Sequence, residues 1–134
     1  MKRQIFNPAS LAQPSGYSYG LAIEGGRLLQ LAGQTGMDAS GRIMHPGDIV
    51  AQFGQALANI LCVVEAAGGD GSSIVKLTIF VTDKRSYRDN LQRVGEKYRA
   101  LMGKHYPPMT LVEVKSLFDD DAMIEIEGVA VLDS

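Results

Sequence analysis

Two carboxylates near the C-terminus are the residues best placed for acid–base chemistry. Glu125 and Glu127 lie two positions apart in the run 123–132, so both side chains point to one face if the run is a strand. The alternate positions are apolar throughout: Ile124, Ile126, Gly128, Ala130 and Leu132. A carboxylate at one end of a buried strand can act as a general acid or base. The alternative, that both Glu side chains only solubilise the sheet, stays open because an unpaired Glu is rarely buried.

A Gly-rich turn and a Tyr-containing loop are the best partners for this carboxylate. The run 33–36 lacks the Lys-Ser/Thr ending and the immediate helix of a phosphate-binding loop. Gly33 is therefore expected to let the backbone approach another group closely. Tyr17 lies in the loop 17–19, between Gly16 and Gly20. From residue types alone, Glu125 with Gly33 and Tyr17 is the leading candidate site.

Other chemistries have weaker support. His45 and His105 stand in separate Pro-adjacent loops without His or Cys at ligand spacing, so we expect surface histidines and no zinc site. The single Cys62 has no neighbouring cation to favour a thiolate and is expected to pack within a helix. The run Asp119-Asp120-Asp121 lacks the ligand spacing of a calcium loop and is expected to be a solvated turn. No Gly-x-Ser-x-Gly nucleophile elbow is present.

The elements that must position these residues follow from periodicity. A hairpin is predicted where 21–23 and 28–32 flank Gly25-Gly26. A helix is predicted from the N-cap Asp48 to Gly68, and strands are predicted over 75–81 and 110–115. A second helix is predicted to begin at a capping box at Ser86, with one apolar stripe: Tyr87, Leu91, Val94, Tyr98 and Leu101. This order predicts an α+β fold of two layers.

Size and charge restrict the function further. The chain of 134 residues, with 46% apolar residues, is expected to form a single domain over 1–134. A net charge of −2 without a basic run disfavours nucleic acid as a partner. We expect no signal peptide and no window that approaches a membrane span, which together with the single cysteine favours the cytoplasm.

Four segments together resemble the RidA/YjgF family of imine and enamine deaminases, also named endoribonuclease L-PSP. They are Gly16-Tyr17-Ser18, the end of the predicted hairpin at 31–34, and the strands 74–83 and 124–131. The resemblance implies a chorismate-mutase-like fold with a mixed sheet of about six strands packed by two helices on one face. It also implies a homotrimer that binds a small metabolite in clefts between subunits, with no metal or organic cofactor.

Part of the family's active-site pattern is present. The resemblance implies that Glu125 is catalytic and that Tyr17, Gly33 and Thr110 bind the substrate, with Thr110 in place of a Ser. The family's Asn on the second helix falls at Leu91, one residue from Asn90.

Three substrate-binding positions depart from the pattern. Met109 stands where the deaminating members have the Arg that grips the substrate carboxylate, Ala32 replaces a Ser, and Leu111 replaces a Cys. A charge-assisted Arg contact contributes roughly 1.5–3 kcal/mol, so its loss weakens binding of a 2-imino acid by about one to two powers of ten. Lys104 or His105, in the preceding loop, are the candidates to replace this cation.

Two functions from different classes follow from this pattern. The first is a hydrolase that deaminates a small imine or enamine other than a standard 2-imino acid. The second is a non-catalytic trimer that binds a small metabolite in the same clefts, because three site residues are replaced together. A third, RNA cleavage, matches the family's endoribonuclease label but not the acidic balance of the chain.

Overall fold

The computed structural model describes residues 1–133. Its strands are β1 (Lys2–Phe6), β2 (Gly20–Glu24), β3 (Arg27–Gln34), β4 (Ile74–Val81), β5 (Met109–Glu113) and β6 (Ile124–Leu132). Its helices are α1 (Ile49–Ala66), α2 (Lys84–Asp89) and α3 (Leu91–Met102), with a short 3-10 turn, η1 (Gly71–Ser73).

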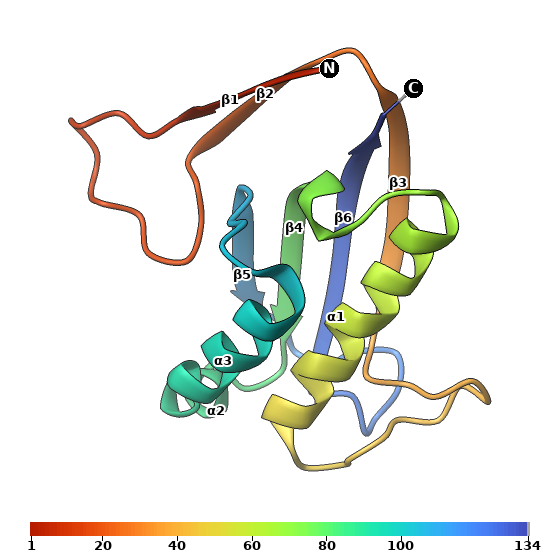
Figure 1. Ribbon diagram of the computed structural model, residues 1–134. Coiled ribbons are helices and arrows are strands. Elements are labelled where there is room, and N and C mark those ends of the chain that lie inside the picture. The colour runs from red at the N-terminus through yellow and green to blue at the C-terminus, as the bar shows by residue number, and fades with distance from the viewer. Residues whose placement is uncertain (134) are drawn as a thin grey trace.

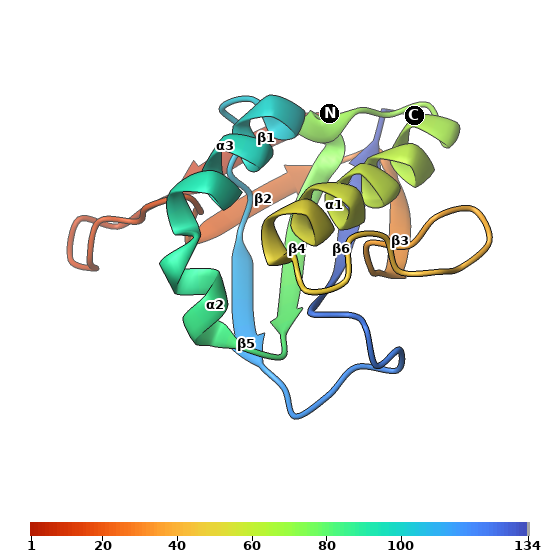
Figure 2. The same cartoon turned by 90° about the horizontal axis from the view of Figure 1, so that it is seen from below.

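The main sheet has four strands in the order β3-β6-β4-β5. β6 pairs antiparallel with both β3 and β4, and β4 pairs parallel with β5, so the sheet is mixed. Helices α1 and α3 pack on one face of it, as Figures 1 and 2 show from two directions. The predicted α+β fold, with a mixed sheet covered by helices on one side, is confirmed.

Helix α1 forms the centre of the core. The Asp48 side chain accepts a hydrogen bond from the Ala51 backbone N–H, which caps the helix where the sequence predicts. The predicted apolar stripe is buried against the sheet: Ile49, Phe53, Leu57, Ile60 and Val64. By length and composition α1 could span a membrane, which the sequence analysis did not anticipate. Half of that window is buried inside the fold, as in the core helix of a soluble protein.

The predicted hairpin between β2 and β3 is wrong, although both strands exist. β2 pairs with β1 in a separate two-stranded sheet, called here the N-terminal ribbon, while β3 pairs with β6. Gly25 and Gly26 join them with φ values of +81° and +88°, which turn the chain away from the main sheet. The ribbon crosses one end of that sheet (Figure 1). Alternation of apolar and polar residues identifies a strand, but the strand with which it pairs depends on residues far away in the sequence.

The second predicted helix is divided in two. α2 is capped by Asp83, whose side chain accepts from the Ser86 backbone N–H, so the helix begins before the predicted capping box. The helical path breaks at Asn90, where α3 begins. Val94 and Tyr98 are buried as expected, but Leu91 and Leu101 are 56% and 37% exposed. Within α3 the buried face follows Val94, Tyr98 and Met102 at intervals of four, which leaves Leu91 and Leu101 at its margins.

Two predictions about isolated polar residues are also wrong. Cys62 is exposed on α1 rather than packed. His105 is half-buried, with its ring Nε2 2.6 Å from the Ile74 carbonyl oxygen, whereas His45 is exposed as expected.

Asp119 does form a turn, since its carboxylate accepts from the Asp121 backbone N–H. Within residues 1–133, no three His, Cys, Asp or Glu side chains gather where they could hold a metal ion.

Candidate functional site

The Glu125 carboxylate lies against the backbone of Gly33. A Cβ added to Gly33 would overlap the Glu125 carboxylate, with the carboxyl carbon only 2.9 Å away. The bulge in the β3–β6 ladder falls at this point, between Leu31 and Gln34. Gly33 therefore permits the close approach that the sequence analysis anticipated, and Glu125 is the group that approaches.

Glu125 points to the sheet face opposite the helices, called here the open face. Its neighbours in the β6 strand, Ile124 and Ile126, are fully buried on the helix side. Its cross-strand partner on β4 is Phe80. Glu125 is half-buried, and its carboxylate lies beside the Gly33 backbone, so it is still open to a ligand on this face.

Thr110 belongs to the same face. In the register, Glu127 lies beside Thr78, and Thr78 lies beside Thr110. Lys76 Nζ donates to Thr110 Oγ1 at 3.3 Å. Ala32 is exposed on β3, next to Gly33. The open face thus brings together four of the predicted site residues: Glu125, Gly33, Ala32 and Thr110.

The other predicted residues meet on the helix side of the sheet. Tyr17, Met109 and Leu111 line a cavity of about 570 Å³, called here the helix-side pocket. Leu91 lines it too, whereas the Asn90 amide donates to the Ser86 carbonyl at 2.8 Å. Leu91 rather than Asn90 therefore occupies the pocket position, and the pocket wall there is apolar.

The loop that carries Tyr17 is tied to the segment before β5. Ser18 is buried, and its Oγ donates to the Tyr106 carbonyl at 2.6 Å. The Ser18 N–H donates to the Pro107 carbonyl at 3.4 Å. Tyr17 and Tyr19 pack edge to face, with ring centroids 5.4 Å apart. These contacts hold Tyr17 beside the pocket.

Two tyrosines in the pocket wall stay protonated well into the alkaline range. Burial raises the pKa of Tyr87 to about 12. Burial, with a smaller contribution from Tyr106, also raises the pKa of Tyr98, whose hydroxyl donates to the His105 carbonyl at 2.7 Å. Tyr98 and Tyr106 stack with ring centroids 5.2 Å apart. At neutral pH the wall is aromatic and uncharged at these positions.

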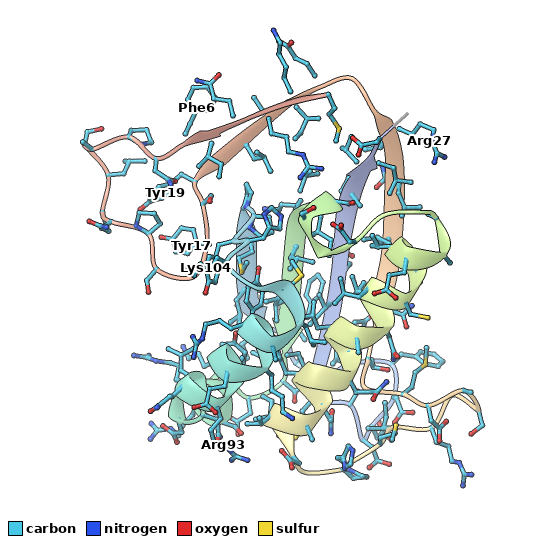
Figure 3. The ribbon with its side chains drawn as sticks, viewed as in Figure 1. Phe6, Tyr17, Tyr19, Arg27, Arg93 and Lys104 are labelled. Atoms are coloured by element: carbon cyan, nitrogen blue, oxygen red, sulfur yellow. The ribbon has the colours of Figure 1, made fainter. Side chains whose placement is uncertain are left out.

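The cations near Met109 are not those named from the sequence. Lys104 and His105 line a different hollow of about 870 Å³, under the N-terminal loop. Figure 3 places Lys104 beside Tyr17, which lies between the two cavities. The cations that line the helix-side pocket are Arg88 and Arg99. Neither Arg was predicted from the sequence to line the site, although Leu91, Gly95 and Arg99 recur at the spacing of one helix face.

Comparison with known proteins gives matches along almost the whole chain. A family model described as Endoribonuclease L-PSP matches residues 9–132. A RutC family protein from Pyrococcus horikoshii is 34% identical over 130 residues, which cover 97% of this chain and 98% of that protein. A 2-iminobutanoate/2-iminopropanoate deaminase from Capra hircus is 32% identical over 130 residues, or 96% and 90% of the two chains.

Among solved structures, the fold is similar to that of YyfB from Yersinia pestis, a Rid family protein of unknown function. The two have a TM-score of 0.87 and 29% identity, and the match covers 98% of this chain and 100% of that one. The similarity therefore extends over almost the whole fold.

Proposed function

Because the chain belongs to the RidA/YjgF family, also named endoribonuclease L-PSP, we propose that it is a hydrolase that deaminates a small reactive imine or enamine. The observation that carries this proposal is the half-buried Glu125 carboxylate held against Gly33 on the open face. A relative that is 32% identical bears the name of an imine deaminase.

The reaction needs one well-placed carboxylate and no cofactor. Glu125 takes a proton from water as the water oxygen bonds to the imine carbon, and then gives that proton to the imine nitrogen. Glu125 then takes the hydroxyl proton of the resulting carbinolamine and passes it to the departing amine, so that ammonia leaves and the carbonyl product remains. Across both steps, imine and water become carbonyl compound and ammonia, so Glu125 ends in its starting state. The Gly33 backbone fixes where the carboxylate stands.

The substrate differs from a standard 2-imino acid because Met109 provides no cation. Leu111 and Leu91 extend the apolar wall around Met109. An apolar wall favours a ligand whose carboxylate, if it has one, lies away from residue 109. We propose that the site lies between subunits of a homotrimer in the cytoplasm and binds a small metabolite.

The test generates imines in situ from several amino acids and follows ammonia or semicarbazone formation. Wild type should accelerate hydrolysis of at least one imine, and Glu125→Gln should abolish that acceleration. Glu127→Gln is the matched control, because Glu127 lies on the same strand and face but is exposed. Equal rates for wild type, Glu125→Gln and buffer on every imine would refute the proposal.

A second candidate is a trimer that binds a metabolite without turnover. It rests on the combined loss of polar groups at Ala32, Met109 and Leu111. A thermal-shift screen separates the two, since a ligand at 100 times its Kd adds about 2.7 kcal/mol to the free energy of unfolding. Reproducible stabilisation by a metabolite that is never consumed supports binding alone. RNA cleavage is disfavoured by the net charge of −2.

A further inference from the structure

The helix-side pocket is aromatic and carries positive charge only. Its aromatic wall is formed by four tyrosines, Tyr17, Tyr87, Tyr98 and Tyr106, together with Phe53. Arg88 and Arg99 are its only charged lining residues, and no Asp or Glu is among them. Both Arg residues are exposed, so their guanidinium groups are available at the mouth of the pocket. A ligand with an apolar body and one anionic end would match this distribution of aromatic and positively charged side chains.

Arg99 lies along α3 with its guanidinium group close to Gly95. A Cβ placed on Gly95 would lie 3.2 Å from Arg99 Nη1 and 3.9 Å from its Cζ. Gly95 is one turn before Arg99, and helical side chains tilt toward the N-terminus, so the guanidinium folds back over Gly95. Glycine is among the least favourable residues inside a helix. Here it leaves room for the guanidinium beside the pocket that Gly95 also lines.

Arg88 reaches the same pocket from another element. It stands in the last turn of α2, and the chain breaks at Asn90 before α3 begins. The break lets Arg88 and Arg99 line one cavity from two helices. Arg93, on the first half of α3, donates instead to the Asn90 side chain at 3.3 Å and is not among the pocket residues.

We propose that Arg99, assisted by Arg88, anchors the carboxylate of an elongated or aromatic ligand whose apolar body lies against Met109 and Leu111. The anion site would then lie on the helices rather than on β5. This inference rests on the proposed function for the reacting group: the substrate is an imine or enamine whose carboxylate is separated from the C=N bond by an apolar spacer. Guanidinium and carboxylate pair through charge-assisted, often bidentate, hydrogen bonds.

The experiment measures binding without turnover. The probes are 3-phenylpropionate and its uncharged amide, titrated by calorimetry into wild type, Arg99→Met, Arg88→Met and the control Arg93→Met. Wild type should bind the carboxylate at least about tenfold more tightly than the amide, since a charged hydrogen bond is worth about one power of ten or more. Arg99→Met should weaken binding of the carboxylate probe by about 10- to 100-fold and leave the affinity for the amide unchanged. Arg88→Met should have a smaller effect, and Arg93→Met none.

Three outcomes would overturn this inference: equal affinity for carboxylate and amide, an equal loss in Arg93→Met and Arg99→Met, or no binding of either probe. Circular dichroism of each variant checks that it is folded. Because the readout is binding, the inference can fail separately from the proposed function. Binding that depends on Arg99, without imine turnover, would support the Arg99 carboxylate site and reject the deaminase function. Imine turnover that is unchanged in Arg99→Met would support the deaminase function and reject the Arg99 carboxylate site.

Discussion

Met109 and Glu125 lie on opposite faces of one sheet. Met109 pairs with Leu77 on β4, and Glu125 pairs with Phe80, three residues further along the same strand. Because side chains alternate along a strand, Leu77 and Phe80 point to opposite sides. Leu77 is buried under the helices. Met109 is on the same side of the sheet and lines the helix-side pocket together with residues of α2 and α3. One subunit cannot bring Met109 and Glu125 to one ligand, so a shared cleft requires the Glu125 of another copy.

We therefore predict that the protein is a homotrimer whose open faces are covered by neighbouring subunits. Val112 is 40% exposed on that face, and Val129 and Phe80 are half-buried there. Removing this apolar area from water would stabilise the assembly by about 25 cal/mol per Å². Light scattering should give three times the 14.4 kDa of one chain.

A pair of matched variants tests which face is used. Val129→Asp should dissociate the assembly, because it places a charge in the covered face. Val63→Asp should leave it intact, since Val63 is 40% exposed on α1, on the outer side of the helix layer. A monomeric wild type, or an assembly that survives Val129→Asp, would contradict the prediction.

Gly33→Ala should reduce activity far more than stability. The added Cβ overlaps the end of the Glu125 side chain, which is flexible enough to rotate away. We expect a loss of about 1 kcal/mol or less in the free energy of unfolding, and a fall in turnover of the order that misplacing a general base produces, about 10²-fold. Urea unfolding and imine hydrolysis measure the two effects. Gly20→Ala is the control, because its Cβ would meet only ordinary contacts at 3.6 Å or more. Parallel losses in both variants would argue against the Glu125 contact.

Met109→Arg should create or enhance activity on 2-iminobutanoate-like substrates. It restores a cation at the position where the resemblance implies a carboxylate clamp, and such a contact is worth about one to two powers of ten in binding. The gain should be larger in an Arg99→Met background, because Arg99 lines the same pocket and repels a second cation. Adding Glu125→Gln should remove the gained activity. An inert Met109→Arg variant in a trimer would favour the metabolite-binding function.

Gln52→Leu should destabilise the fold by about 1–3 kcal/mol. Gln52 is fully buried in α1, and its amide nitrogen donates to the His45 and Asp121 carbonyls at 3.1 and 3.2 Å. Its carbonyl oxygen accepts from the Met123 N–H at 2.8 Å, directly before β6. Replacement removes the side-chain partner of the Asp121 carbonyl and of the Met123 N–H, whereas the His45 carbonyl still accepts from the Asp48 N–H at 3.1 Å. Gln55→Leu, which loses only a bond to Asn59, should change unfolding by clearly less in urea titrations. Equal effects would contradict this role for Gln52.

Stability should fall as pH rises above about 10. The pKa of Tyr87 is about 12 in the folded protein against 10.0 for a free tyrosine, so the unfolded chain loses this proton first. The contribution is complete below pH 10 and is lost between about 10 and 12, with a slope of up to about 1.4 kcal/mol per pH unit. Urea unfolding at several pH values measures this decline, and Tyr87→Phe should reduce it by the share of Tyr87 while the share of the buried Tyr98 remains. Tyrosinate absorbance that shows every tyrosine titrating together near pH 10 would contradict it.

Local pattern was enough to predict the frame of this protein. The α1 stripe and its Asp48 cap, the strand β4 and the apolar face of β6 all followed from spacing along the chain. Each depends on residues within a turn or two of one another, where periodicity and capping act directly. Gly33 was also recognised, because a glycine in a strand indicates a close approach, although not of which group.

Tertiary structure alone decided how these parts meet. β2 pairs with β1 instead of β3, because partner choice depends on hydrogen bonds between residues far apart in the sequence. The buried face of α3 follows Val94, Tyr98 and Met102 rather than the predicted leucines, and the break at Asn90 places Arg88 on a separate helix that lines the pocket of Arg99. The faces of Met109 and Glu125 are set by the registers of β5 and β6 on β4, since a shift of one residue reverses every side chain in a strand. Residue types predicted the carboxylate, the family resemblance implied the lost cation at Met109, and the sheet register placed the two positions on opposite sides.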